Sequence, residues 1–248
     1  MKKFDLTIWL GLGIGLTAIL LGAWLDGLSF SFLWHPTAAL VVGGGTLGAV
    51  IVRRGAGGVK SAAQAVWKLR HAETTESHQV ELGKLIWLSR SAQKSGAKAY
   101  ENYADACGDP LVAQGLLMVA EFAEKAQIKD VLTRRLEWEN ENGLHDAATL
   151  EAAGGFAPTF GIMGAVLGLV GVLRVLDKPE ALGVGIATAF VATVYGIGLA
   201  NLFFFPLAAR LRARHEAHLR RREEIAVVIM ALAAKDAPRQ IANRFNVK

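Results

Sequence analysis

Long uncharged apolar runs alternate with charged segments along this chain. Four runs contain no Asp, Glu, Lys or Arg: residues 6–25, 32–52, 154–173 and 181–209. About 20 apolar residues suffice for a helix to cross the hydrocarbon core of a bilayer, and the fourth run is long enough to tilt or to extend beyond it. We therefore predict an all-α integral membrane protein with four transmembrane helices.

The segment between the second and third runs, residues 53–153, is predicted to form a helical domain. Its acidic and basic residues are mixed, which is typical of helices with a solvated face. Apolar residues at helical spacing predict one or two helices over 61–106 and a further helix over 111–141. Gly108-Asp109-Pro110 separates them, and Asn142-Gly143 ends the last one.

Most of the basic residues that flank the apolar runs lie on one side, and the connections on the other side are short and carry little positive charge. Lys2 and Lys3 precede the first run, Arg53 and Arg54 follow the second, and further arginines follow the fourth. The positive-inside rule then places both termini and the long connection in the cytoplasm. The expected organisation is 1–52 (spans 1 and 2), 53–153 (cytoplasmic domain), 154–209 (spans 3 and 4) and 210–248 (cytoplasmic tail).

The tail begins with a basic run, residues 210–222, which we expect to lie near anionic lipid headgroups. The apolar residues 225–234 that follow are too few to cross a bilayer. We expect them to pack against the other cytoplasmic helices.

Composition narrows the possible classes of function. The 248 residues are 52% hydrophobic and 20% charged, with a net charge of +5, and a soluble enzyme would carry more charge. Cys107 is the single cysteine, so an internal disulfide and a cysteine metal cluster are both impossible. No nucleophile–base set is recognisable, and the mixed charges form no nucleic-acid patch. We expect no enzyme activity, no bound cofactor and no nucleic-acid partner.

None of the four apolar runs contains a central Asp, Glu, Lys or Arg. Such groups mark ion pathways inside membranes, so a conducted ion would need a carboxylate from a partner. Pro158 and Pro206 each remove a backbone donor and free the carbonyl four residues earlier. They mark either simple bends or hinges beside a hydrated pathway. The hydroxyls of Thr159 and Thr193 can bind an ion or their own backbone.

Glycines recur at three- and four-residue intervals in the apolar runs, for example at Gly44 and Gly48 and at Gly161, Gly164 and Gly168. Small residues let helix backbones approach closely. Two interpretations stay open: packing within the chain, or a face for another subunit or a partner's helix.

Three segments together resemble the MotA/PomA family of flagellar stator subunits. Residues 40–49 (LVVGGGTLGA) resemble its second-span motif and residues 157–169 (APTFGIMGAVLGL) its third-span motif. Ala192-Thr193-Val194-Tyr195-Gly196 and the later Phe205-Pro206 resemble its fourth. The layout of two spans, a cytoplasmic domain and two further spans is also similar.

The resemblance implies a function that the residues alone do not show. A chain of this family would form a homopentameric ring in the bacterial inner membrane, around two helices of a MotB-type partner. That partner would bring the ion-binding Asp and a peptidoglycan anchor, and ion flow would drive the ring against the rotor protein FliG. The resemblance places five residues at the ion pathway: Pro158, Thr159, Ala165, Thr193 and Pro206.

It also implies one acidic and one basic contact with the rotor in the cytoplasmic domain. Glu101 falls on the acidic position. The strict basic position holds Gln93, with Lys94 beside it and Arg90 a helical turn earlier, so either of these two could supply the charge. The alternative is that Arg90, Lys94 and Glu101 are only solvated helix charges.

The transported ion is expected to be a proton. Sodium-driven members of the family tend to carry a threonine where this chain has Ala165, which has no oxygen to offer. Backbone carbonyls could still complete a sodium site. Two other functions stay open: a proton-channel subunit like ExbB or TolQ, which has one span before its cytoplasmic region, and a self-contained channel lined by backbone and hydroxyls.

Overall fold

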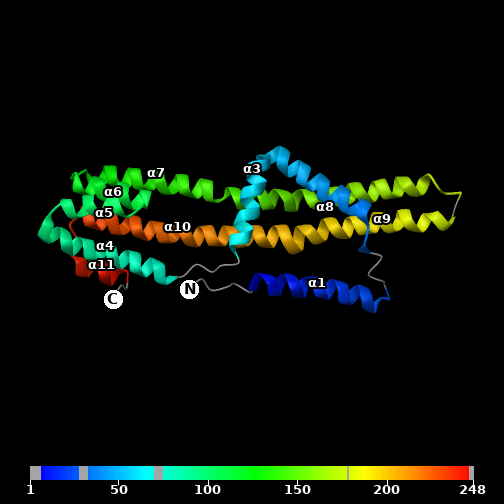
Figure 1. Ribbon diagram of the computed structural model, residues 1–248, viewed down its shortest axis with the longest axis horizontal. Coiled ribbons are helices and arrows are strands. Elements are labelled where there is room, and N and C mark those ends of the chain that lie inside the picture. Colours follow the sequence, from blue (N-terminus) through cyan, green and yellow to red (C-terminus); the bar gives the residue numbers. More distant parts are fainter. Residues whose placement is uncertain (1–6, 28–32, 70–74, 178, 246–248) are drawn as a thin grey trace. The chain divides into compact units, whose positions relative to one another are not determined.

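The computed structural model describes residues 7–27, 33–69, 75–177 and 179–245, and these contain helices and no β-strand. The all-α prediction is confirmed for this part of the chain. The chain divides into two compact units. In chain order the helices are α1 (Thr7–Leu25), α2 (Pro36–Ala39), α3 (Gly45–Leu69), α4 (Thr75–Ser95), α5 (Lys98–Ala106), α6 (Pro110–Ala120), α7 (Lys125–Gly143), α8 (His145–Leu173), α9 (Pro179–Gly198), α10 (Phe205–Ala233) and α11 (Pro238–Arg244) (Figure 1).

One unit, the span unit, comprises Phe4–Ala72 and Leu144–Ala213. Within the described residues, three continuous helical stretches are long and apolar enough to cross a membrane: Pro36–Leu69, Lys125–Leu173 and Leu182–Ala233. They contain the second, third and fourth predicted spans. The first predicted span corresponds to α1, in which Trp9–Leu25 forms a shorter apolar helix.

Glycines set the packing of α8 against α9, which lie side by side in Figure 1. A Cβ atom on Gly196 would lie 2.6 Å from the carbonyl oxygen of Ala157, and one on Gly168 would lie 2.9 Å from that of Gly185. Because these neighbours are backbone atoms, no side-chain rotation could relieve the clash. The intrachain interpretation therefore holds for Gly168 of the third run and Gly196 of the fourth.

Two π-helical turns and one glycine interrupt the regular helices. The π-helical turns are Leu40–Gly44, before α3, and Leu199–Phe204, before α10. Inside α3, Gly55 has φ 72° and ψ 162°, a conformation that only glycine adopts readily. Figure 1 shows α3 bending sharply. The helix then continues to Leu69, so it covers the first residues of the predicted 61–106 helical region.

The other unit, the loop-tail unit, comprises Glu73–Gly143 and Arg214–Lys248 with Met1–Lys3. Figure 1 shows α4, α5, α6, α7 and α11 around the end of α10. Leu82, Leu85, Leu116, Ile225 and Ile229 are fully buried in one core cluster. The predicted apolar face of the connection and the packing of the tail's apolar stretch against it are both confirmed.

The predicted single helix over 111–141 is wrong. α6 ends at Ala120, Phe122 takes a left-handed φ of 56°, and α7 begins at Lys125. The amide of Ala123 bonds back to the carbonyl of Met118 at 3.0 Å, as in a helix that ends on a left-handed residue. Glycine normally fills this position, so the sequence carries no sign of the break.

Candidate functional site

The close crossing of α8 and α9 brings two of the predicted ion-pathway residues together. A Cβ atom on Gly196 would lie 3.1 Å from the Cα of Pro158, and one on Gly161 would lie 3.5 Å from the Cα of Thr193. Pro158 lies inside α8, which runs without interruption from His145 to Leu173. Pro158 and Thr193 therefore share one helix–helix contact, although 35 residues separate them in the sequence.

Both predicted hydroxyls bond to their own helix. Thr159 Oγ1 donates to the carbonyl of Phe156 at 2.7 Å, and Thr193 Oγ1 donates to that of Ala189 at 3.2 Å. The Thr159 side chain is exposed and Thr193 is half-buried. Each oxygen keeps lone pairs that a water or an ion can use. The hydroxyls are thus oriented by backbone bonds and still able to accept.

Pro206 lies in the first turn of α10, directly after the π-helical turn Leu199–Phe204. Turns of this kind leave backbone groups outside the regular ladder and are frequent at functional sites. A Cβ atom on Gly154, one helical turn before Pro158, would lie 2.7 Å from the ring of the neighbouring Phe205. Ala165 lies half-buried on α8, two turns further on. The role of these residues in an ion pathway stays a prediction.

Hydrogen bonds that the motifs did not predict join α9 to the segment before α2. The Tyr195 hydroxyl donates to the carbonyl of Leu33 and accepts from the amide of His35 at 3.4 Å. The His35 ring lies 3.4 Å from Thr188 Oγ1. Tyr195 belongs to the fourth-span motif. A tyrosine in an apolar run is a sequence signal of this contact, because its hydroxyl needs a hydrogen-bond partner when it is buried.

Two buried side-chain atoms in the described part of the chain have no hydrogen-bond partner, Thr46 Oγ1 and Arg54 Nε. Thr46 lies on α3 and is 3% exposed. An unpaired buried donor or acceptor is destabilising. Sequence patterns cannot show such a deficit, because it depends on what surrounds each atom.

The three predicted rotor-contact residues lie exposed in the loop-tail unit. Arg90 and Lys94 are one turn apart on α4, and Glu101 is in the first turn of α5. Gly96, with φ 67°, separates the two helices. None of the three charges has an ion-pair partner among the described residues. They are free for a partner protein, and the contact itself stays a prediction.

A buried charge cluster holds α6, α7 and α10 together. Arg222 is 7% exposed, and its guanidinium donates to Glu139 at 3.0 and 3.1 Å and to Asp109 at 3.0 Å, with a further short contact to Asp109. Asp109 also caps α6, because its Oδ1 accepts from the amides of Leu111 and Val112. The predicted breaker Gly108-Asp109-Pro110 is thus a helix N-cap with proline at the first position.

Burial alone would raise the pKa of Asp109, but the hydrogen bonds and charge of Arg222, helped by the two backbone amides, hold that pKa below its usual value. The expectation that the whole basic run 210–222 lies near lipid headgroups is therefore wrong for Arg222. Arg212 likewise bonds to Glu151 at 2.6 Å. In both cases a carboxylate that is distant in the sequence pairs with the arginine, but the Arg212 side chain is still 42% exposed.

In the described part of the chain, no three His, Cys, Asp or Glu side chains gather as metal ligands.

Comparison with known proteins agrees with the motifs. Residues 104–224 match the MotA/TolQ/ExbB proton channel family. Motility protein A of Bacillus subtilis is 29% identical over 244 residues, which are 97% of this chain and 89% of that protein. The structure of C. jejuni MotAB superposes with a TM-score of 0.85 at 25% identity, covering 98% of this chain and 96% of that one. The flagellar MotAB stator complex from Bacillus subtilis gives 0.83 at 28% identity, covering 97% and 94%.

Sequence and fold together are those of a helical membrane protein, and residues 104–224 are similar to the MotA/TolQ/ExbB proton channel family. Over nearly its whole length the chain is similar to flagellar stator subunits of the MotA and PomA kind.

Proposed function

We propose that this chain, with a MotB-type partner, conducts protons across the bacterial inner membrane and converts their flow into torque on the rotor protein FliG. The observation that carries the proposal is the likeness to MotAB over 98% of the chain at a TM-score of 0.85. That likeness includes the spans and the long connection alike. A partial match would leave the rotor-facing part unaccounted for.

The chemistry of the spans supports a partner. The four apolar runs carry no carboxylate, so the proton-carrying group has to come from another chain. Pro158 and Thr193 meet where α8 crosses α9, and a partner's carboxylate placed there would have an oriented hydroxyl within reach. Ala165 adds no oxygen, which favours a proton over a sodium ion that needs several ligands.

We include α1 as the first of four spans. Its 19 residues form a helix about 28 Å long, close to the roughly 30 Å of a hydrocarbon core. Trp9 and Trp24 lie near its two ends and are 53% and 58% exposed, as tryptophans at membrane interfaces are. With four spans, both termini and residues 53–153 lie in the cytoplasm.

The exposed glycines support an oligomer. A Cβ on Gly11, Gly13, Gly43, Gly44 or Gly48 would meet nothing within 4 Å. Within the described chain these small residues pack against nothing, unlike Gly161 and Gly196. We assign them to contacts with neighbouring subunits of a pentamer or with the two helices of the MotB-type partner.

Complementation tests the function. The chain is expressed in cells that lack stators, either alone or with the MotB-type protein encoded beside it. We expect swimming only when both are present, with rotation that stops when a protonophore is added. Swimming restored by the chain alone would favour a self-contained channel, and an unchanged motility defect with both proteins would overturn the proposal.

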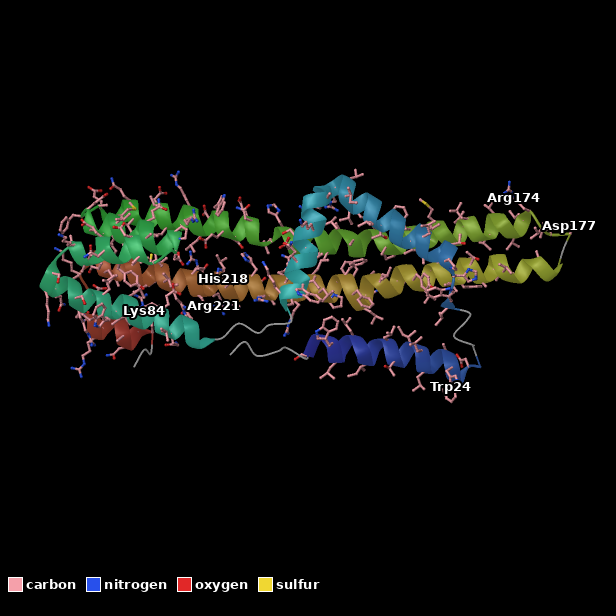
Figure 2. All side chains as sticks on the ribbon, viewed as in Figure 1. Trp24, Lys84, Arg174, Asp177, His218 and Arg221 are labelled. Atoms are coloured by element: carbon pink, nitrogen blue, oxygen red, sulfur yellow. The ribbon has the colours of Figure 1, made fainter. Side chains whose placement is uncertain are left out.

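Cysteine labelling tests the orientation separately. After Cys107→Ser, Asp177→Cys in the connection between α8 and α9 (Figure 2) should react with an impermeant maleimide added to intact cells. Ser61→Cys on α3 should react only after the cells are opened. The reverse pattern would invert the topology and leave the family assignment untouched.

A further inference from the structure

A cavity of about 430 Å³ opens where α3 leaves the second predicted span. Arg53 and Arg54 line one wall, directly after the last apolar residue of that run. The opposite wall is one face of α8, from Ala148 through Glu151 to Thr159. All of these residues belong to the span unit.

Arg54 lines this cavity with a half-buried side chain. Its Nε is buried and has no hydrogen-bond partner. A buried N–H group that lacks an acceptor is destabilising. The Arg54 guanidinium therefore has hydrogen-bonding capacity that the described residues leave unused.

The charge of the cavity selects an anion. Glu151 is the only carboxylate in its wall, and its Oε1 lies 2.6 Å from Arg212 Nη2. That ion pair leaves the charges of Arg53 and Arg54 uncompensated among the lining residues. The planar guanidinium of arginine can donate two parallel hydrogen bonds to the oxygens of a phosphate or a carboxylate, so these are the anions that it binds best.

We propose that this cavity binds the phosphate of an anionic phospholipid headgroup, with the half-buried Arg54 and the exposed Arg53 as its donors. The inference rests on the proposed orientation, which puts the end of the second span at the cytoplasmic headgroup layer, where basic pockets between helices take such lipids. Thr159 lies in the same cavity wall, so the lipid would sit beside a residue of the predicted ion pathway.

The test measures lipid binding directly. The full chain is purified with its MotB-type partner in neutral detergent, and its thermal stability is titrated with short-chain phosphatidylglycerol, short-chain phosphatidylcholine or inorganic phosphate. The variants are Arg54→Gln and Arg53→Gln. Arg174→Gln is the matched control, an exposed arginine at the other end of α8 (Figure 2).

We expect phosphatidylglycerol to stabilise the complex, and Arg54→Gln to weaken that apparent affinity by about tenfold or more, as expected for a lost charged hydrogen bond. Arg53→Gln should weaken it less, and Arg174→Gln hardly at all. Phosphatidylcholine should bind more weakly, because its choline ammonium opposes the arginines. Equal binding of inorganic phosphate with the same dependence on Arg54 would support the phosphate site and assign a free anion as its source.

Equal losses of lipid affinity in Arg54→Gln and Arg174→Gln would mean that the lipid is attracted non-specifically by positive charge, and they would overturn the proposal. So would an Arg54→Gln complex that falls apart while its lipid affinity is unchanged, since the guanidinium would then serve a neighbouring chain's carboxylate. Arg54→Lys, which keeps the charge, should restore part of the affinity if Arg54→Gln folds poorly. Binding is measured without motility, so failure of the stator function would not be mistaken for failure of the lipid site.

Discussion

Replacing Arg222 by methionine should loosen the loop-tail unit more than any other single loss of an arginine there. Methionine keeps an apolar stem in a site that is 7% exposed but removes the guanidinium that bonds to Glu139 and Asp109. Removing one member of a buried ion pair typically destabilises by 3–5 kcal/mol, because the remaining charges stay buried without compensation.

The partners that remain place Arg222→Met at the lower end of this range. Asp109 keeps its two backbone amides, and Glu139 keeps Arg135 at 3.3 Å. Their side chains also retain 25% and 17% of their exposure, so water can solvate part of each carboxylate. We expect a loss of about 3 kcal/mol, which corresponds to roughly a hundredfold change in a local opening equilibrium.

Hydrogen–deuterium exchange of the full chain in detergent measures this change. Amides of α6 and of the apolar end of α10 should exchange about a hundredfold faster in Arg222→Met. Arg220→Met, at an exposed neighbouring position, is the control and should change stability by less than about 0.5 kcal/mol. If both variants exchange alike, the cluster does not hold these helices together and the argument from burial is wrong.

The same cluster predicts a dependence on pH. The pKa of Asp109 is lowered in the folded protein, so its contribution is complete above the carboxyl's ordinary pKa and is lost as the pH falls through the lower folded value. The protection of α6 amides, measured relative to their intrinsic exchange rate at the same pH, should therefore fall on acidification below about pH 4. Arg222→Met should lose less protection, and an equal loss would assign the acid sensitivity to other groups.

Three further predictions concern function. Pro158→Leu should insert at normal levels yet abolish swimming, because a leucine restores a backbone donor and adds bulk beside Gly196; normal swimming would make the proline a simple bend. Glu101→Lys should reduce torque, and a charge reversal on the rotor should restore part of it, although one exposed pair contributes only about 0–1 kcal/mol. No effect of any reversal at Arg90, Lys94 or Glu101 would remove the docking hypothesis. Swimming speed should not change when sodium is replaced by potassium, as Ala165 predicts, and a speed that follows external sodium would reverse the assignment of the ion.

Much of the architecture could be predicted from the sequence, because it depends on local patterns. The separation of apolar runs from charged segments indicated membrane helices and the helical connection, since twenty uncharged residues have few other stable environments. The spacing of Leu82, Leu85 and Leu116 identified faces that the structure buries. The motifs around Pro158 and Pro206 indicated the family, because a specific run of small residues is itself local information.

Only the tertiary structure decided which charges are buried. In the sequence, Arg222 is one more member of a basic run. In the structure it is buried and bonds to Asp109, 113 positions away, and to Glu139, 83 positions away, so that it holds three helices together. The same holds for Arg54, whose Nε lacks a partner only because of what packs around it. The dependence on distant neighbours also explains why the sequence did not predict the break after Ala120, at the left-handed Phe122. The energy of a charge or of a left-handed residue depends on neighbours brought from elsewhere in the chain, and a pattern read along the sequence does not contain those neighbours.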